Sequence, residues 1–221
     1  MSIALIGQGL LASHLSHWWT ACGVEFTQLG RGDLIHPKTL STFQRIFLAI
    51  NDDEIESFYL KFASQTQAKW IHFSGSLYIK EMIGIHPLMS FSNELYTTSF
   101  YENLLWVVDH ECELDQIFPT SIKNYTKIAA ELKPYYHALC VLGGNIPHLL
   151  WNELNQKFSD LGIHEQDFKK YIQITTENFL KDRKPTGPIV RNDKVTIGKN
   201  IASLQPSLAK IYQGVRECQH E

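Results

Sequence analysis

The sequence predicts an α/β protein: an N-terminal domain with a parallel sheet flanked by helices, followed by a small all-α domain. Short apolar runs alternate with helix-like stretches through the first half, which is the pattern of a parallel sheet covered on its faces. The chain opens on one such run, which ends in a Gly-x-Gly-x-x-Ala turn. Beyond residue 130 the apolar residues take helical spacing instead. These observations predict domains at residues 1–130 and 131–221.

The first strand and the first helix are expected at Ile3–Ile6 and Leu10–Cys22. Apolar residues recur along this helix at i, i+4 and i+7, which gives it one buried face (Leu11, Leu15 and Trp18). Gly23 is a natural stop for the helix. The five tryptophans of the chain show no regular spacing, and we expect them in the core or at interfaces.

The remaining strands of the first half follow at short intervals. Phe47–Ile50 is continuously apolar, as expected of a parallel strand that is buried on both faces. Asn51 and the two aspartates after it begin a helix that runs to about Ser64. The strands are expected at residues 25–29, 45–50 and 70–73, around 85–91, and near 104–108.

The second half reads as helices after a mixed segment at residues 122–128. Gly143-Gly144 either breaks or kinks the chain between the first two helices, and the sequence leaves both possibilities open. Asp193 is well placed to cap a helix after the breaker Lys184–Pro188. The helices are expected at residues 131–142, 146–158, 166–180, 194–204 and 207–216.

Composition excludes several classes of protein. The chain has 221 residues, 44% hydrophobic and 19% charged, with a net charge of −3 and no block of Lys or Arg. An ordinary globular composition with a slightly acidic charge gives no reason to expect nucleic acid or an anionic membrane as partner. The first residues lack the basic start of a signal peptide, and no apolar stretch is long enough to span a bilayer. We therefore expect a cytoplasmic protein.

Cysteine and histidine spacing predicts no metal site. The four cysteines are scattered without a Cys-x-x-Cys pair (Cys22, Cys112, Cys140 and Cys218), and we expect free thiols. The ten histidines form neither His-x-x-x-His nor His-Glu-x-x-His.

The glycine turn at the start of the chain points to a nucleotide. Gly7 lets the chain turn off the strand, Gly9 lets the backbone approach a pyrophosphate, and the small Ala12 lets the helix pack close to the sheet. The helix N-terminus offers free N–H groups to the phosphates. We predict a Rossmann dinucleotide site that includes Gln8, Leu10 and Leu11. The alternative is a glycine turn that binds nothing.

The end of the second strand indicates which dinucleotide binds. An acidic residue there holds the ribose 2′-hydroxyl of NAD, whereas an arginine accommodates the 2′-phosphate of NADP. Arg31 lies close to this position and Asp33 follows two residues later. A guanidinium matches phosphate geometry, which favours NADP over NAD. The alternative is that Arg31 is a solvated loop residue and Asp33 contacts the ribose.

The rest of the cofactor site is expected where the next strands end, at the topological switch point of the sheet. Asn51 follows the third strand, and Ser74 and Gly75 follow the fourth. Small residues on a flexible backbone suit a loop beneath a nicotinamide or a ribose, although they suit a simple turn equally well.

Several separate motifs together resemble the Rossmann-like proteins that carry a DUF2520 domain. They include the opening turn and His72–Ser76, and the specific segments are His-Pro-x-x-Ser-Phe at residues 86–91 and Thr-Gly-Pro-x-x-Arg-x-Asp at 186–193. Tyr136-His137-Ala138 and Asn145 lie between these two segments. Such proteins are similar to pyrroline-5-carboxylate reductase, ketopantoate reductase and the β-hydroxyacid dehydrogenases. The resemblance implies an NADP-dependent oxidoreductase whose substrate is open, and a homodimer formed through the helical domain.

Three residues of the first long helix of the second domain are candidates for catalysis. His137 carries an imidazole that titrates near neutrality, which suits acid–base work. Asn145 lies two turns further on, where its amide could hold a substrate carbonyl or carboxylate if the helix continues past the glycines. Lys133 lies one turn before His137 and could bind a carboxylate or lower the pKa of that histidine. The alternatives are a packed histidine, a helix cap and a solvated lysine.

Two further residues are candidates for binding the substrate. His86 precedes a proline, which favours extended backbone and could direct its ring into the cleft. The alternative is that His86-Pro87 has a structural role in a rigid turn at the sheet edge. Arg191 follows a rigid Thr-Gly-Pro turn and could bind a substrate anion or pair across a dimer. The function that the residues favour is hydride transfer to or from a small carbonyl, imine or hydroxy acid. The alternatives are a non-catalytic NAD(P)-binding sensor or partner-binding module and, less well supported, a methyltransferase.

Overall fold

The computed structural model describes residues 2–33, 35–109 and 113–219. The chain divides into two compact units, Met1–Leu150 and Trp151–Glu221, and each is described by itself. The predicted domain boundary at residue 130 rests on the change of sequence pattern and stays a prediction.

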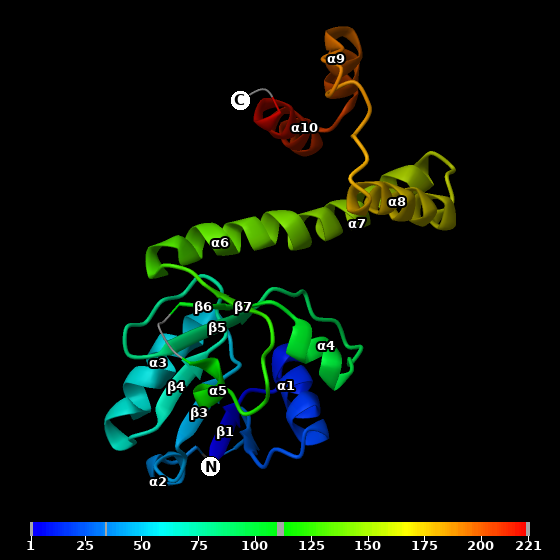
Figure 1. Cartoon of the computed structure of the whole chain (residues 1–221). Helices are drawn as coiled ribbons and strands as arrows, with labels where there is room; N and C mark the ends of the chain where they lie inside the picture. Colours follow the sequence, from blue (N-terminus) through cyan, green and yellow to red (C-terminus); the bar gives the residue numbers. More distant parts are fainter. Residues whose placement is uncertain (1, 34, 110–112, 220–221) are drawn as a thin grey trace. The chain divides into compact units, whose positions relative to one another are not determined.

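The first unit is built on one seven-stranded sheet of order β2-β1-β3-β4-β5-β6-β7, with helices on its faces (Figure 1). The first five strands run parallel to one another, so the predicted α/β fold with a parallel sheet is confirmed. The bounds of all seven strands are Ile3–Ile6 (β1), Thr27–Leu29 (β2), Arg45–Leu48 (β3), Lys69–His72 (β4), Ile83–Pro87 (β5), Trp106–Val108 (β6) and Tyr125–Lys127 (β7).

The far edge of the sheet departs from a purely parallel arrangement. Strand β6 runs antiparallel to β5, with Ile85 opposite Val108, and β7 runs parallel to β6. The connection from β5 to β6 contains only the short helix α4 (Thr98–Asn103). This helix is about 9 Å long, too short to return along the sheet as the crossover helix of a parallel pair does.

Both faces of the central strands are buried, which explains their continuous apolar sequences. Leu5, Phe47 and Ile71 point to one face and pack with helix α1 (Leu10–Ala21). Ala4 and Ile46 lie among the residues of the other face, which pack with helix α3 (Asp52–Phe62). This alternation along each strand is the two-residue period of a β-sheet.

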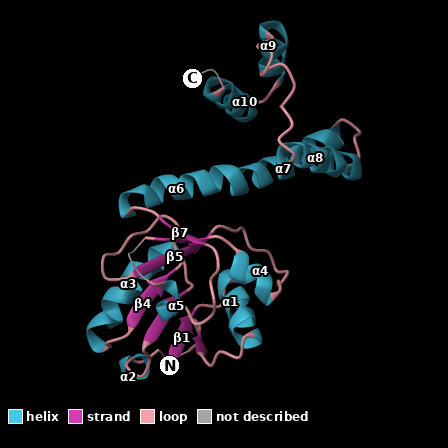
Figure 2. Ribbon diagram, viewed as in Figure 1, coloured by secondary structure: helices cyan, strands magenta, loops and turns pink. Residues whose placement is uncertain are grey.

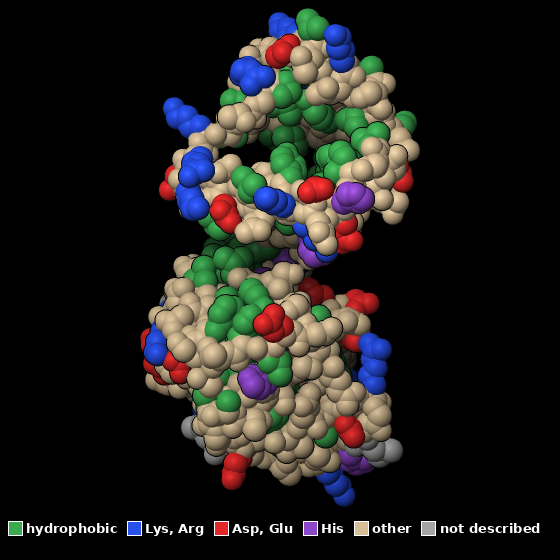
Figure 3. All heavy atoms as spheres, turned by 90° about the vertical axis from the view of Figure 1, so that its right-hand side faces the viewer, with side chains coloured by type: hydrophobic (Ala, Val, Ile, Leu, Met, Phe, Trp, Pro, Cys, Tyr) green, Lys and Arg blue, Asp and Glu red, His purple; other side chains and the backbone are tan. Residues whose placement is uncertain are grey.

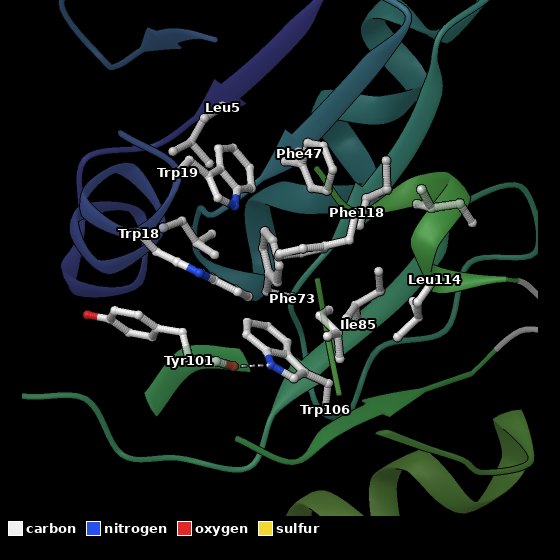
Figure 4. Packing of buried hydrophobic residues seen from close by; sticks show 14 of the residues in the cluster. Leu5, Trp18, Trp19, Phe47, Phe73, Ile85, Tyr101, Trp106, Leu114 and Phe118 are labelled. Carbon is white, nitrogen blue, oxygen red and sulfur yellow. Dashed lines mark hydrogen bonds between the residues drawn. The ribbon is translucent and has the colours of Figure 1, made fainter. Parts of the chain in front are cut away.

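Aromatic rings fill the layer on the α1 side (Figure 4). Trp18 stacks on Trp106 with 5.9 Å between ring centroids, and Trp19 contacts Phe47 edge to face at 5.0 Å. The Trp106 indole N–H donates to the Tyr101 carbonyl at 3.2 Å. Trp18, Trp19 and Trp106 are fully buried, as expected for core residues.

Short helices that the sequence did not predict complete the first unit. They are α2 (Pro37–Leu40), α4 and α5 (Leu114–Ile117), with 3-10 turns at Ala63–Gln65 and Ala130–Leu132. Elements of four to six residues have no room for a helical hydrophobic period, so the pattern could not reveal them.

The chain stays helical through Gly143-Gly144. Helix α6 (Lys133–Cys140) passes into a π-helical turn, η3 (Val141–Asn145), which leads into α7 (Ile146–Asp160). Of the two possibilities that the sequence left open, a break at the glycines is therefore wrong. A π turn is a local widening of the helix, and such turns are frequent at functional sites.

The second unit is all-helical, as predicted, and comprises the end of α7 with α8 (Glu165–Leu180), α9 (Lys194–Ser203) and α10 (Pro206–Cys218) (Figure 2). The Asp193 carboxylate accepts the Thr196 N–H at 3.1 Å, which confirms the predicted cap of α9. Among the described residues of this unit, Phe168 and Ile197 are the buried hydrophobic side chains. Many others are exposed, and hydrophobic side chains are visible at the surface in Figure 3.

Candidate dinucleotide cleft and active site

Gly7 makes the turn from β1 into α1 in a backbone conformation that favours glycine. Its φ is +134°, and a Cβ at this position would lie 2.1 Å from the Ala49 carbonyl oxygen. The Gly7 N–H donates to the Leu29 carbonyl at 2.8 Å, which ties the turn to the end of β2. The role predicted for Gly7 in turning the chain is thus visible in the structure.

Gly9 leaves the N-terminus of α1 open. It is the N-cap residue, with no side-chain cap, and the first turn of the helix contains no acidic residue. A Cβ built on Gly9 would meet nothing within 4 Å. The first N–H groups of α1 therefore face open space, where an anion could accept from them.

The turn borders a cleft of about 970 Å³ at the carboxyl ends of β1, β2 and β3. This is the topological switch point, because the chain passes from β2 on one side of β1 to β3 on the other. The cleft brings together seven of the predicted cofactor-binding residues: Gly7, Gln8, Gly9, Leu10, Leu11, Arg31 and Asn51. Ser74 and Gly75 are not among its lining residues.

The loop after β2 presents Arg31 at the surface beside this cleft. The guanidinium is exposed and lies 3.3 Å from both carboxylate oxygens of Glu54 on α3. The Asp33 carboxylate accepts the Gly30 N–H at 2.6 Å and so closes the loop. Gly30 is packed beneath Gln8, since a Cβ there would lie 2.0 Å from the Gln8 side chain.

Helix α3 contributes cleft residues that the sequence analysis did not identify. Glu54, Ser57, Phe58 and Lys61 line the cleft on one side. Counted from Glu54 they recur at i, i+3, i+4 and i+7, so one face of the helix that follows β3 was the signal that could have found them.

The loop after β4 is fixed to the start of α3. The Ser74 hydroxyl donates to the Asp52 carboxylate at 2.5 Å and accepts the Leu77 N–H at 3.0 Å. Ser76 donates to the same carboxylate oxygen at 3.4 Å. These bonds hold Gly75 in place between the two serines.

Gly75 lies against two histidines from distant parts of the chain. A Cβ at Gly75 would lie 2.6 Å from His137 Cδ2 and 3.0 Å from His86 Cδ2 and Nε2. The imidazole rings of His86 and His137 meet edge to face, with 5.8 Å between centroids. Three predicted site residues, one from each group of candidates, therefore come together.

Tyr136 completes this cluster and was not predicted as a site residue. Its hydroxyl lies 2.8 Å from His86 Nδ1. Burial, with the nearby His137 and Lys133, lowers the pKa of His86 to about 4. Burial, together with a side-chain hydrogen bond to Cys140, raises the pKa of Tyr136. Both side chains are accordingly neutral near pH 7.

Lys133 forms a buried ion pair with Asp109 beneath the cluster. The two charged atoms are 2.7 Å apart, and the side chains are 3% and 1% exposed. Burial lowers the pKa of Lys133, while the Asp109 carboxylate opposes that shift. The other Asp109 oxygen accepts the Gly84 N–H at 2.9 Å. Lys133 is therefore not the solvated lysine that the sequence left as the alternative.

Comparison with known proteins assigns part of the chain to a family. The sequence model of a family described as "Domain of unknown function (DUF2520)" matches residues 110–217. The resemblance drawn from the sequence motifs is thereby confirmed. Residues 110–217 match the model of the DUF2520 domain. No curated protein is significantly similar in sequence to the whole chain.

Solved structures resemble the fold over nearly the whole length. A candidate NADP oxidoreductase of Bacteroides fragilis has a TM-score of 0.77 at 15% identity, covering 99% of this chain and 97% of that one. An imine reductase of Myxococcus stipitatus in complex with NADP⁺ has a TM-score of 0.65 at 10% identity, covering 99% and 91%. Pyrroline carboxylate reductase of Plasmodium falciparum with NADP bound has a TM-score of 0.61 at 14% identity, covering 99% and 96%. At such identities these likenesses establish the Rossmann-like fold.

The segment that matches the DUF2520 model contains the remaining predicted site residues. Asn145 lies in the π turn and is exposed. Arg191 belongs to the second unit and is exposed. Their predicted roles toward a substrate stay predictions, as do those of His137 and Lys133.

Across residues 2–33, 35–109 and 113–219, no group of three His, Cys, Asp or Glu side chains could hold a metal ion. Cys22, Cys140 and Cys218 are free thiols, and Cys112 lies outside the described residues. No described helix is both long enough and apolar enough to cross a membrane.

Proposed function

We propose that this protein is a cytoplasmic oxidoreductase that binds NADP(H) in the cleft and transfers a hydride to or from a small carbonyl, imine or hydroxy acid. The observation that carries the proposal is the cleft at the switch point of the sheet, with the open α1 N-terminus at its rim. A volume of about 970 Å³ suits a ligand of this size.

The described residues suit the parts of a dinucleotide. The free N–H groups after Gly9 would bind the pyrophosphate, and Arg31 would bind the 2′-phosphate of NADP. Arg31 would have to leave Glu54 to do so, which is a small cost because the pair is exposed and weak. Asp33 already accepts the Gly30 N–H, so the NAD alternative has less support.

The histidine cluster suits the reacting end of the cofactor. NADP(H) supplies the hydride chemistry itself, and the chain has to orient the substrate and offer polar groups to it. Gly75 leaves space beside His86 and His137 that any side chain would fill. We assign acid–base work to His137 and substrate binding to His86. The Lys133 ammonium, paired with Asp109, would act on the site through its charge.

A non-catalytic NAD(P)-binding module is the second candidate, and two observations favour it. Lys133 is held by Asp109 in a packed ion pair, and Asn145 is exposed. An enzyme in which both side chains contact the substrate would present them to the site instead.

Calorimetric titration of the purified protein with NADPH, and separately with NADH, tests the cofactor assignment. We expect tighter binding of NADPH, a loss of that preference in Arg31→Ala, and no loss in Glu54→Gln, which only frees the guanidinium. Absence of binding for both cofactors would contradict the proposal. A panel of small carbonyl and imine compounds, followed by NADPH oxidation, then separates an enzyme from a binding module.

We also propose a homodimer. Large apolar side chains form a row along α6, η3 and α7 at spacings of four, three, four and three residues, and all are exposed (Tyr135, Leu139, Leu142, Ile146 and Leu149). In a regular α-helix this spacing gives the a/d seam by which helices pack together, and here the π turn at Val141–Asn145 rotates the residues after it relative to those before it. A second copy of the chain offers a row of the same period.

A further inference from the structure

His86 has one ring nitrogen in a hydrogen bond and one without. Nδ1 lies 2.8 Å from the Tyr136 hydroxyl. Nε2 lies on the side of Gly75, where a Cβ would be 3.0 Å away. Within the part of the chain that the structure describes, Nε2 has no hydrogen-bond partner.

The chemistry of the two partners determines the direction of the bond. A neutral imidazole has one N–H and one accepting nitrogen, and the nitrogen that accepts fixes the proton on the other. A phenol hydroxyl is a good donor, and an imidazole nitrogen is a good acceptor. Burial keeps both groups neutral, since it lowers the pKa of His86 and raises that of Tyr136.

We propose that Tyr136 is a positioning residue, whose hydroxyl donates to Nδ1 of His86 and so holds the imidazole proton on Nε2, beside Gly75. This proposal rests on the proposed function, because the open N–H is then the donor that meets an oxygen of the substrate. A carbonyl or carboxylate oxygen accepts from such a donor, whereas the opposite tautomer would offer it a lone pair.

The surroundings favour a fixed ring. Tyr136 and His86 also meet edge to face, with 5.5 Å between centroids. The helix that carries Tyr136 begins at Lys133, which is anchored to Asp109 at the end of β6. The hydroxyl is thus held by the backbone of α6 and reaches a strand residue fifty positions earlier.

In the competing arrangement, His86 is the donor and Tyr136 is the acceptor of their hydrogen bond. His86 Nδ1–H would then donate to the Tyr136 oxygen, the Tyr136 hydroxyl would turn toward the Cys140 thiol one turn further along α6, and Nε2 would be bare. A thiol sulfur is a weak acceptor, which makes this arrangement the less favourable one.

Nitrogen-15 NMR of the full-length protein at neutral pH distinguishes the two tautomers directly, with His86→Gln used to assign the signals. We expect Nε2 of His86 to resonate as a protonated nitrogen and Nδ1 as an unprotonated one. The reverse pattern, or an even mixture of both tautomers, would overturn the proposal. This measurement needs no cofactor, so it stands even if the protein binds neither NADPH nor NADH.

Two tyrosine variants test the positioning role. Tyr136→Phe retains the ring and removes the hydroxyl, and we expect the His86 signals to shift toward a mixture of tautomers. Tyr135→Phe, at the exposed neighbouring position, serves as the control and leaves them unchanged. An unchanged His86 spectrum in folded Tyr136→Phe would show that the tyrosine does not set the tautomer.

The contact with substrate is tested with glyoxylate, the smallest carbonyl acid, added to protein saturated with NADP⁺. We expect the Nε2 signal of His86 to move while Nδ1 changes little. A stationary Nε2 signal at saturating glyoxylate would overturn the substrate contact. Absence of NADP⁺ binding would instead reject the proposed function, and the two failures are therefore distinguishable.

Discussion

At the scale of residues, the two glycines of the opening turn serve different purposes. Gly7 has a positive φ and lies against the Ala49 carbonyl, so it is required by the fold. Gly9 has an ordinary φ of −76° and faces open space, so the fold would accept a side chain there. Glycine at position 9 suits the N-cap of α1 and also leaves room for the approach of a ligand.

Substitution of each glycine by alanine separates these purposes. We expect Gly7→Ala to lower the free energy of unfolding by on the order of 1–3 kcal/mol or more, because of its conformation and the clash. Gly9→Ala lowers the free energy of unfolding by less, about 0.5–1 kcal/mol because alanine is a weaker N-cap, but it weakens NADPH binding at least tenfold. Urea unfolding and calorimetry measure the two quantities. Unchanged affinity in Gly9→Ala would place the pyrophosphate elsewhere.

The buried His86 predicts a dependence of stability on pH. Its pKa is about 4 in the folded protein against an ordinary value of 6.5, so the unfolded chain binds more protons between these values. The folded state is therefore fully favoured above about pH 6.5 and loses up to about 3 kcal/mol as the pH falls toward 4.

Urea unfolding of the wild type and of His86→Gln across this pH range measures that contribution. The stability difference between the two proteins is expected to shrink as the pH falls, since the variant has no imidazole to protonate at this position. A difference that stays constant with pH would mean that His86 is as easily protonated in the folded protein as in the unfolded chain.

The sequence predicted some of these residues and missed others for a definite reason. Gly7, Gly9, Gly75, His86 and His137 belong to local motifs, and the structure places them at the cleft or together in the cluster. The partners Tyr136 and Asp109 lie 50 and 24 residues from the groups they contact. Contacts over such separations depend on the folded arrangement of strands and leave no periodic pattern in the sequence.

At the scale of elements, the prediction was best where a strand or helix has a long apolar period. β1, α1 and α3 lie close to their expected bounds, because apolar residues in a regular pattern and the residues at the helix ends identified them in the sequence. Strand β6 was expected near residues 104–108, but its antiparallel direction was missed because a three-residue strand with buried faces reads the same in either direction. The π turn was missed because two glycines predict interruption, while the helix on both sides overrides their weak propensity.

The glycines of the π turn offer a test at this scale. A Cβ on Gly143 would meet nothing within 4 Å, and the same holds for Gly198 within α9. Alanine is favoured over glycine inside a helix by about 1 kcal/mol, so we expect either substitution to raise the free energy of unfolding by up to that amount. A loss of stability in Gly143→Ala alone would indicate that another surface packs on the turn. Thermal unfolding of both variants gives the comparison.

At the scale of the whole molecule, the apolar row on α6, η3 and α7 predicts association. Leu142 is 58% exposed in the single chain, so Leu142→Glu is tolerated by the monomer but would bury a charge in a helix-to-helix seam. We expect twice the chain mass of 25.4 kDa for the wild type in light scattering and the single mass for this variant. Leu60→Glu, an exposed leucine on α3, is the control. A wild-type protein that is monomeric at micromolar concentration would contradict the homodimer.

The second unit fits the same expectation, because Phe168 and Ile197 are its buried hydrophobic residues in the described part of the chain. A helical segment with so small a core gains stability by covering its apolar side chains with another surface. The periodicity of the apolar residues predicted the helices of this unit, but that periodicity does not identify the surface that covers them.

The stacked indoles of Trp18 and Trp106 give the first unit an optical property of its own. Two identical chromophores 5.9 Å apart share their excited states, and because their planes are skewed by 24° this coupling gives a pair of circular dichroism bands of opposite sign. The two residues come from α1 and β6, so the splitting exists only once the first helix and the far edge of the sheet have met. The unlabelled protein thus carries a spectroscopic marker for the packing of α1 against β6.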